Sequence, residues 1–430
     1  MAMTIEPATK ERVGPRLMLV LGCLFFGISI TEACSVYVLP LTIKLFTNNP
    51  QYIFLILAIN PAFGFIAQPL VGIWSDRIWT RWGRRGFFLI ICAPVVALTL
   101  ICIPFISSFA ILIIAVVVLQ FFQDMLNGSD QPLIADLVPP EQRTFMLGWV
   151  KTMENVGFLL VLYVGMTWVT GYKDSHGEEQ FGLPLYFTAA ACQIVFVMFA
   201  AFFLKEKPVE WKDRPKLTPM SYVRDFVQQP MLLRIAMAYF LRAFTRTAVV
   251  GSIALYAIQT LGFTEKELGR SWGLMPVIAL ASGIPLGLLV ERFAKHRVLQ
   301  SAFSAVIVGC IVGYFSGTTT GLSVAAFCFG FGDMMLEVTH KAFMSEHYPK
   351  EQIGQLTGAV NIFYATGRTA ALVFMGFCIK WVNPNVDWDT VGSTITADYH
   401  IIWIVSGLSA LMGILILSTV RDLRHEKVKR

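Results

Sequence analysis

The stretch Gly72-Ile-Trp-Ser-Asp76-Arg77-Ile-Trp-Thr-Arg81-Trp-Gly83-Arg84-Arg85 separates two long apolar segments and places four arginines in one short connection. Arginines at this density stay on the cytoplasmic side of a membrane, so the connection fixes the orientation of its neighbours. Gly72 permits close helix approach, and Asp76 can accept hydrogen bonds from a helix N-terminus or an arginine. Arg84 and Arg85 can reach acids at nearby helix ends. The ordered pattern therefore predicts a hinge between two membrane helices and not merely a basic topogenic loop.

The bulk composition indicates a membrane protein. The 430 residues are 56% hydrophobic and only 14% charged, and the mean hydropathy is +0.64. Apolar runs of about 20 residues recur along the chain, and this is the length that a helix needs to cross a bilayer. The net charge of +6 comes from cations in the short connections between these runs. It therefore reports membrane orientation, and we expect no nucleic-acid partner.

Hydropathy predicts an all-α membrane protein with twelve transmembrane helices in two six-helix bundles around a central cavity. The spans of the first half are expected at 16–40, 51–74, 86–108, 110–137, 146–170 and 183–204. Those of the second half are expected at 231–259, 271–291, 297–316, 319–345, 356–381 and 399–420. Trp149, Trp272, Trp381 and Trp403 lie near span ends, where tryptophan is expected to face lipid or the membrane interface.

The polar segments and their charges complete the domain plan. It consists of a cytoplasmic tail at 1–15, a bundle at 16–204, a cytoplasmic linker at 205–230, a bundle at 231–420 and a cytoplasmic tail at 421–430. Cations gather in the even-to-odd connections and at both ends of the chain. This bias predicts a multi-pass protein of a plasma membrane or bacterial inner membrane with both termini in the cytoplasm.

The two halves repeat a pattern. Gly72-x-x-x-Asp76-Arg77 recurs as Gly287-x-x-x-Glu291-Arg292, each after a second helix and before a basic loop. Phe122-Gln-Asp124-Met125 recurs as Phe331-Gly-Asp333-Met334, in the same order and again about 210 positions later. Parallel six-helix repeats about an axis along the membrane normal create a cavity between the bundles near mid-bilayer, open to one side at a time.

Polar side chains at membrane depth mark one face of the fourth predicted helix. Gln120, Asp124, Asn127 and Gln131 follow the spacing i, i+4, i+7 and i+11, which places them on a single face. A carboxylate near mid-span is unfavourable unless it lines a cavity or finds a partner. We therefore expect the stripe to bind substrate, and an amide stripe that joins helices is the alternative. Asp124 is also expected to carry the coupling proton, together with Glu32 of the first span.

The second half carries its own charged and polar residues at membrane depth. They are Arg242 and Arg246 on the seventh helix, Asp333, Glu337, His340 and Lys341 on the tenth, and Asn361 and Arg368 on the eleventh. The residues expected to contact substrate are Asp333, Glu337, Arg242 and Asn361. A structural salt-bridge ladder between helices is the alternative, because acids and bases one turn apart can neutralise one another.

Three further polar residues are expected to have structural roles. Lys151 and Glu154, near the cytoplasmic end of the fifth helix, can pair locally. His340 is expected to be a hydrogen-bonded packing residue.

The cytoplasmic helix ends are expected to form a gate. Asp136 ends the fourth helix at the level of the arginine loop, and a contact to Arg84 or Arg85 would latch the cytoplasmic side shut. Such a contact would form in one state and break in the other. The expected gate residues are Gly72, Asp76, Arg77, Arg84, Arg85, Asp136, Arg143, Glu291 and Arg292.

Read from Gln68 to Arg85, the opening stretch has four more residues between Asp-Arg and Gly-Arg-Arg than the common form of the major facilitator superfamily. It resembles the plant sucrose transporters and their animal and bacterial relatives, which are akin to the glycoside–pentoside–hexuronide:cation symporters such as melibiose permease. Gly128-Ser-Asp-Gln-Pro-Leu-Ile-Ala135-Asp136-Leu137 is similar to the fourth-helix motif of the same group. The resemblance is dense from about residue 20 to 165 and thin in the second half.

The resemblance implies uptake of a glycoside, in the first place a disaccharide, driven by a proton gradient or alternatively a sodium gradient. It implies a monomer without a cofactor. In the sucrose carriers an acid and a base occupy the fourth-helix stripe, and here Gln120 and Gln131 stand at those positions, with Asp124 one turn inside. Melibiose permease has a fourth-helix Asp in a position that Asp124 matches better. Coupling therefore falls to Asp124 or to Glu32, or the substrate is not sucrose.

Two functions remain open from the residues. The first is a sugar:cation symporter with alternating access. The second is a proton-coupled organic-anion or sugar-acid transporter, in which Arg242, Arg246 or Arg368 clamps a carboxylate bidentately. Ion pairing of the arginines distinguishes the two functions, because arginines already neutralised by Asp333 and Glu337 need no bound anion. An enzyme is not expected, since the chain has no nucleotide loop, no metal-spaced ligand cluster and no Ser/His/Asp set in a solvent-exposed segment.

Overall fold

The computed structural model describes residues 13–64, 67, 71, 74, 78–139, 142–170, 181–206, 230–290, 292–347, 353–389 and 396–420. These residues form an all-α fold, in which the one strand-like feature described is a single bridge between Thr80 and Gly83. Ten helical stretches of the described chain are long and apolar enough to cross a membrane. The predicted fold class is therefore confirmed as all-α with many candidate spans.

The helices follow the predicted spans in order. In the first half they are α1 (Pro15–Tyr37), α2 (Leu39–Lys44), α3 (Pro50–Leu57), α4 (Ile59–Gly64), α6 (Gly86–Cys102), α7 (Phe109–Leu137), α8 (Arg143–Tyr163), α9 (Leu183–Cys192) and α10 (Met198–Phe203). In the second half they are α12 (Pro230–Val250), α13 (Ile253–Leu255), α14 (Glu265–Trp272), α15 (Leu274–Val290), α16 (Lys295–Phe315), α17 (Thr319–His347), α18 (Ile353–Val382) and α19 (Ile401–Ser418). Short π-helical segments, η4 (Gln193–Val197) and η5 (Tyr256–Thr260), continue α9 and α13.

Two of the twelve predicted spans are shorter than the rest in the described chain. The second appears as α3 and α4, which together reach from Pro50 to Gly64, and residues beyond Gly64 are described only in part. The eighth appears as the 17-residue α15, directly after α14. The number twelve therefore remains a prediction, and so does the linker at 205–230, most of which lies outside the described residues.

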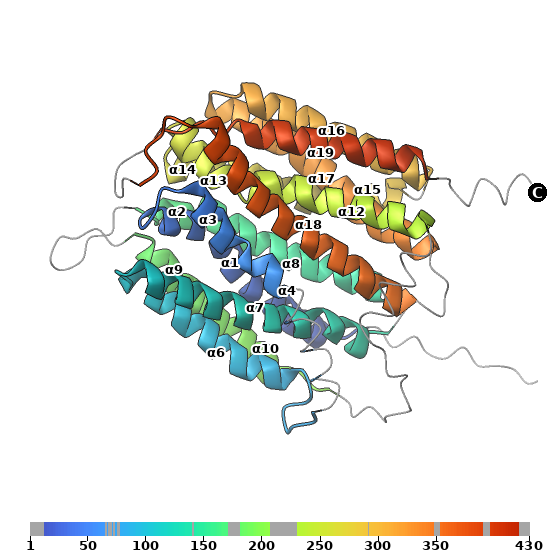
Figure 1. The fold of residues 1–430 in the computed structure, drawn as a ribbon. Coiled ribbons are helices and arrows are strands. Elements are labelled where there is room, and N and C mark those ends of the chain that lie inside the picture. Colours follow the sequence, from blue (N-terminus) through green and yellow to red (C-terminus); the bar gives the residue numbers. More distant parts are fainter. Residues whose placement is uncertain are drawn as a thin grey trace, which may run out of the picture.

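Helices of each half pack mainly on one another. α1 lies against α8, and α6 lies against α7 and α9, while α16 packs on α17 and α19, and α12 packs on α18 and α19 (Figure 1). The halves meet where α18 crosses α3 and α4 and where α8 contacts α14 and α15. Helices α4, α8 and α18 therefore stand at the junction, next to the polar stripe of α7.

Glycines permit the closest approaches at this junction. A Cβ atom on Gly269 of α14 would lie 2.0 Å from the backbone oxygen of Leu162 in α8. A Cβ atom on Gly376 of α18 would lie 3.1 Å from the backbone oxygen of Pro50 in α3. Backbone atoms cannot move aside as a flexible side chain can, so the short distance at Gly269 requires glycine.

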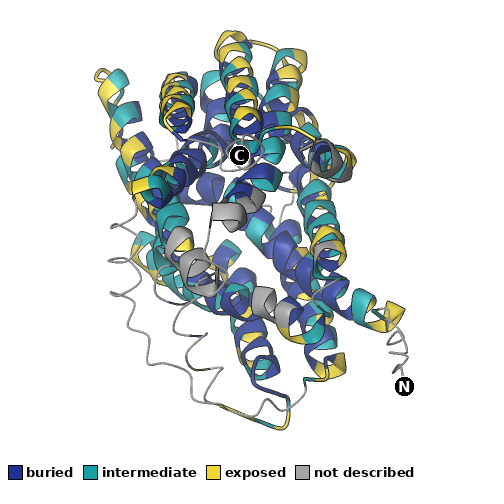
Figure 2. Ribbon diagram, turned by 90° about the vertical axis from the view of Figure 1, so that its right-hand side faces the viewer, coloured by how far each residue is buried: buried dark blue, intermediate teal, exposed yellow. Residues whose placement is uncertain are grey.

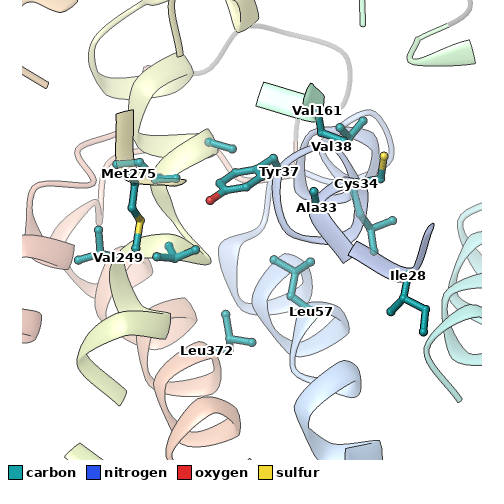
Figure 3. Packing of buried hydrophobic residues seen from close by; sticks show 14 of the residues in the cluster. Ile28, Ala33, Cys34, Tyr37, Val38, Leu57, Val161, Val249, Met275 and Leu372 are labelled. Carbon is teal, nitrogen blue, oxygen red and sulfur yellow. The ribbon is translucent and has the colours of Figure 1, made fainter. Parts of the chain in front are cut away.

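One apolar cluster runs through both halves. It includes Tyr37 of α1, which points toward Met275 and Val249 of the second half (Figure 3). Buried residues concentrate on the inward helix faces, whereas exposed residues cover the outer surface (Figure 2). Many of the exposed side chains are large and apolar, among them Leu98 and Ile114. Such a surface suits lipid and not water.

The four tryptophans near the span ends differ in exposure, and Trp149 is half-buried, with Nε1 donating to the backbone oxygen of Met18 at 2.8 Å. Trp381 is 79% exposed, as an interfacial residue should be. Trp272 and Trp403 are fully buried and pack against each other with ring centroids 6.2 Å apart. The expectation that these two face lipid was wrong, because Trp272 of α14 packs on Phe329 of α17 and Trp403 of α19 packs on Tyr256 of η5.

Candidate functional site

The predicted stripe on α7 lies on the inner side of the fold. Gln120 and Asp124 are buried, with 2% and 3% of their surfaces exposed, and Asn127 is half-buried. Gln120 Oε1 accepts a hydrogen bond from Asn60 Nδ2 at 2.6 Å. The side chains of Asp130 and Gln131 lie outside the described part of the chain. Three of the four stripe residues thus occupy an inward face of α7, where the periodicity places them.

Asn60 of α4 joins the two halves at membrane depth. Its Oδ1 accepts a hydrogen bond from Arg368 Nη2 of α18 at 3.0 Å, while its Nδ2 donates to Gln120. Asn60 was not among the predicted site residues. An amide between the apolar Ile59 and Pro61 in a predicted span is a signal of the same kind as those that singled out α7.

The acids of α17 pair with the arginines of α12. Arg246 Nε donates to Asp333 Oδ2 at 2.9 Å, and Arg242 Nη2 lies 3.5 Å from Asp333 Oδ1. Arg242 Nη2 also donates to Glu337 Oε2. Arg242 is almost fully buried, with 1% of its side chain exposed. The ladder between helices that the sequence left as an alternative therefore exists, with its acids on α17 and its bases on α12.

Aromatic rings surround the buried Arg242. Its guanidinium carbon lies 5.6 Å from the ring centroid of Tyr239 and 5.7 Å from that of Tyr364. The two tyrosine rings stack with centroids 4.8 Å apart. His340 packs on Tyr239 and places Nε2 3.3 Å from the backbone oxygen of Ile235. His340 therefore has the hydrogen-bonded packing role that was predicted, and the side chain of Lys341 lies outside the described residues.

A second charged group faces this cluster from the first half. Lys151 Nζ and Glu154 Oε1 of α8 are 2.7 Å apart, so their predicted local pairing is confirmed. Glu32 of α1 lies in the electrostatic field of this pair and of Arg246 and Arg368. Within the described residues Glu32 makes no hydrogen bond and no ion pair. The Lys151–Glu154 pair and Glu32 therefore belong, with Arg242, Arg246, Asp333, Glu337 and Arg368, to one charged centre. The position of the pair near one end of α8 did not predict this.

The arginine loop and Asp136 meet as predicted. Asp136 Oδ2 lies 2.6 Å from Arg84 Nη2 and 2.7 Å from Arg85 Nε. Glu206, just after α10, adds an unforeseen second carboxylate. It accepts hydrogen bonds from the backbone N–H groups of Arg84, Arg85 and Gly86 at 3.2, 3.0 and 2.9 Å. Gly83 precedes them with a φ of 89°, a conformation that favours glycine.

All of these contacts lie within the first half of the chain. They tie the start of α6 to the ends of α7 and α10, so they brace one end of this half. A contact inside one half need not break when the two halves move relative to each other, and the gate role of Asp136, Arg84 and Arg85 stays a prediction.

The remaining predicted site residues are less informative. Arg143 Nε donates to the backbone oxygen of Val138 at 3.1 Å, and Arg292 and Asn361 are exposed. Gly72, Asp76, Arg77 and Glu291 lie outside the described residues. No group of three His, Cys, Asp or Glu side chains in the described ranges is placed to hold a metal ion.

The sequence profile of the Major Facilitator Superfamily matches residues 17–372. The chain belongs to the major facilitator superfamily. It is therefore a multi-pass membrane protein of a transporter family, as the arginine loop and the charged spans predicted.

Two sequence relatives and one solved structure are similar to this chain. Human "Proton-associated sugar transporter A" is 39% identical over 79 residues, which cover 18% of this chain and 10% of that protein. "Sucrose transport protein SUC3" of Arabidopsis thaliana is 26% identical over 168 residues, which cover 34% of this chain and 27% of that protein. The match spans less than a third of either relative. The crystal structure of the nucleoside transporter NupG superposes with a TM-score of 0.71 at 11% identity, over 94% of this chain and 98% of that one. This likeness shows the fold alone.

Proposed function

We propose that this protein is a secondary active transporter that takes up a neutral sugar, in the first place a disaccharide or other glycoside, by cation symport with alternating access. The proton is the proposed coupling ion, with Na⁺ as the alternative. The observation that carries the proposal is the pairing of Arg242 and Arg246 with Asp333 and Glu337. These arginines already have carboxylate partners, so the centre suits a neutral substrate.

The charge balance of the centre supports the same choice. This centre and the α7 stripe together carry five carboxylates and four cations: Glu32, Asp124, Glu154, Asp333 and Glu337 against Lys151, Arg242, Arg246 and Arg368. A bound anion would add one uncompensated charge to this described set, and burying such a charge is unfavourable. A neutral sugar leaves the balance unchanged. The sugar-acid alternative is therefore the weaker proposal.

The α7 stripe provides the polar groups that a sugar requires. A carboxylate accepts hydrogen bonds from hydroxyl groups, while an amide both donates and accepts. Asp124 supplies the carboxylate, and Gln120 and Asn127 supply the amides. Closing the cavity around a charged Asp124 is unfavourable, so a proton or sugar hydroxyls must neutralise it before occlusion. This requirement links substrate binding to proton binding.

We place both termini and the linker at 205–230 in the cytoplasm, because the cations of the connections lie on that side. The gate would be built on the arginine loop, with Gly72, Asp76, Arg77, Glu291 and Arg292 completing it. The working unit would be a monomer.

Uptake by proteoliposomes under an inward proton gradient tests the proposal. The substrates are sucrose, maltose and a sugar acid, and proton flux is recorded in parallel with sodium-driven uptake as a second arm. We expect a neutral disaccharide to enter with protons. Movement of the sugar acid alone would reject the neutral-sugar proposal and assign the arginines to substrate.

A further inference from the structure

Arg368, Asn60 and Gln120 form one hydrogen-bonded chain across the junction of the halves. Arg368 belongs to α18, Asn60 to α4 and Gln120 to α7, and α4 contacts both of the other helices (Figure 1). Arg368 Nη2 donates to Asn60 Oδ1 at 3.0 Å, and Asn60 Nδ2 donates to Gln120 Oε1 at 2.6 Å. A cation of the second half therefore reaches the polar stripe of the first half through a single side chain.

The arginine fixes the orientation of both amides. A guanidinium group carries N–H donors and no acceptor, so Asn60 must turn its carbonyl oxygen toward Arg368. The amino group of Asn60 then faces Gln120, which can accept only with its own carbonyl oxygen. An isolated amide can be turned over without losing a hydrogen bond, whereas each amide in this chain has one orientation.

This orientation leaves the amino group of Gln120 at the end of the chain. Gln120 is buried, and within the part of the molecule that the structure describes its amino group donates to no residue. Its side chain lies on the same face of α7 as Asp124 and Asn127. A buried N–H group without an acceptor is unfavourable, so this group is suited to an acceptor atom on a bound substrate.

We propose that Asn60 is a positioning residue, which holds Gln120 with its N–H donor toward the substrate and so selects a hydrogen-bond acceptor at that point. The acceptor is a ring oxygen, a glycosidic oxygen or a hydroxyl oxygen of the sugar. In this role Asn60 acts through Gln120 and need not touch the substrate. Because Arg368 imposes the orientation, a side chain of the second half sets the polarity of a site in the first half.

The inference rests on the proposed function, which it deepens by assigning a specificity-determining donor to the α7 stripe. Asp124 and Gln120 then select different groups of the substrate. The carboxylate of Asp124 accepts hydrogen bonds from hydroxyl groups, whereas the amino group of Gln120 donates to an oxygen. A substrate must therefore offer both a donor and an acceptor to this face of α7, as a sugar does.

Exchange of Asn60 for aspartate separates this role from that of a merely structural bridge. A carboxylate in this place still accepts from Arg368, with a stronger, charge-assisted bond, so the connection between the halves is kept. It has no amino group, so Gln120 must turn over and donate to it, which leaves the carbonyl oxygen of Gln120 toward the substrate. Asn60→Asp therefore keeps the bridge and reverses the polarity of the group that Gln120 presents.

The readout is the KM for counterflow in proteoliposomes, measured with sucrose, maltose and analogues in which fluorine replaces one hydroxyl group. Fluorine can accept a hydrogen bond weakly but cannot donate one. The proteins are wild type, Asn60→Asp, Asn60→Leu and the control Gln51→Glu. Gln51 accepts from Lys380 of α18 at 3.1 Å, so the control also replaces an amide by a carboxylate between the halves, at a bond that does not involve Gln120. Thermal unfolding in detergent is recorded for each variant.

In Asn60→Leu we expect KM to rise about tenfold, equivalent to one hydrogen bond of about 1.4 kcal/mol, because Gln120 is no longer held. Asn60→Asp should have an effect of similar size, which identifies the contacted group. A ring or glycosidic oxygen cannot donate to the reversed amide, so KM of the parent sugar rises. A hydroxyl group can turn to donate, so only the analogue with fluorine in its place binds more weakly than it does to wild type. Gln51→Glu should leave every KM at its wild-type value.

The outcomes separate the inference from the function. Wild-type KM values for the parent sugar and all analogues in Asn60→Asp would overturn the inference and leave the function standing. A lower unfolding temperature of Asn60→Leu without a change in KM would also overturn it, since a merely structural Asn60 predicts that result. Should Asn60→Asp fail to fold, Gln120→Glu gives the same reversal, because its carboxylate accepts from Asn60 and presents a second acceptor. If wild type moves neither sugar, the proposed function is rejected and the inference with it.

Discussion

Arg246 of α12 donates to Asp333 of α17 at 2.9 Å, and the second oxygen of the same carboxylate lies 3.5 Å from Arg242. Asp333 therefore neutralises two arginines at once, one of them almost fully buried. Removing this carboxylate leaves Arg246 without its described carboxylate partner, whereas Arg242 keeps Glu337.

Asp333→Ala should consequently destabilise the protein by roughly 3 kcal/mol, the lower end of the range for breaking a buried ion pair, because Arg246 is one-third exposed. The double variant Asp333→Ala with Arg246→Ala should recover part of the loss, since one unpaired cation is removed. Thermal unfolding in detergent of the single and double variants measures this coupling. An unfolding temperature of Asp333→Ala equal to that of wild type would show that the pairs contribute nothing to stability.

Asp124→Asn should abolish sugar accumulation against a gradient while leaving exchange of sugar across the membrane. The amide keeps the hydrogen-bonding shape but cannot take up and release a proton, so the driving force is disconnected from movement. Uptake and counterflow in the same proteoliposomes separate the two activities. Ser129→Ala is the control, because Ser129 lies on the same helix and bonds to the backbone oxygen of Met125. Full accumulation by Asp124→Asn would remove this residue from coupling.

Glu206→Gln should lower stability by about 1–2 kcal/mol, because a charged acceptor is lost from three backbone N–H groups at the start of α6. Glu267→Gln is the matched control. Glu267 caps α14 together with Thr264, whose hydrogen bonds hold the pKa of Glu267 below its usual value, but it is exposed to solvent. Denaturation midpoints of both variants decide the point. Equal losses of stability in the two variants would mean that burial of Glu206 against the arginine loop adds nothing to the stability of the protein.

Gly269→Ala should disrupt the contact between α14 and α8, because its Cβ atom would meet the backbone oxygen of Leu162 at 2.0 Å. We expect loss of transport and a clear fall in unfolding temperature. Gly148→Ala in α8 is the control, since a Cβ atom there meets nothing within 4 Å. It should be neutral or stabilise by up to about 1 kcal/mol through helix propensity. A wild-type unfolding temperature for Gly269→Ala would show that the two helices can separate without loss.

The sequence by itself determined the membrane fold, the order of the helices and the groups that must be explained at membrane depth. Apolar runs of bilayer length allow little other than helices, so hydropathy predicted twelve spans, and the long described helices follow them in order. The local contacts followed in the same way. Lys151 and Glu154 are three residues apart on one helix, and Asp136 ends a helix at the level of the arginine loop, so their partners were predictable.

Only the tertiary structure decided which distant residues meet. Hydropathy identifies segments that leave water, but it does not distinguish a side chain that faces lipid from one that faces another helix. For this reason the positions of Trp272 and Trp403 were predicted wrongly. The partners of Asp333, the bridge made by Asn60 and the cap made by Glu206 depend on how helices far apart in the chain pack together. Pairing across about 90 residues, as between Arg246 and Asp333, or across 308, as between Asn60 and Arg368, leaves no periodic trace. The physical reason is that a buried charge must find a partner, but packing alone selects which one.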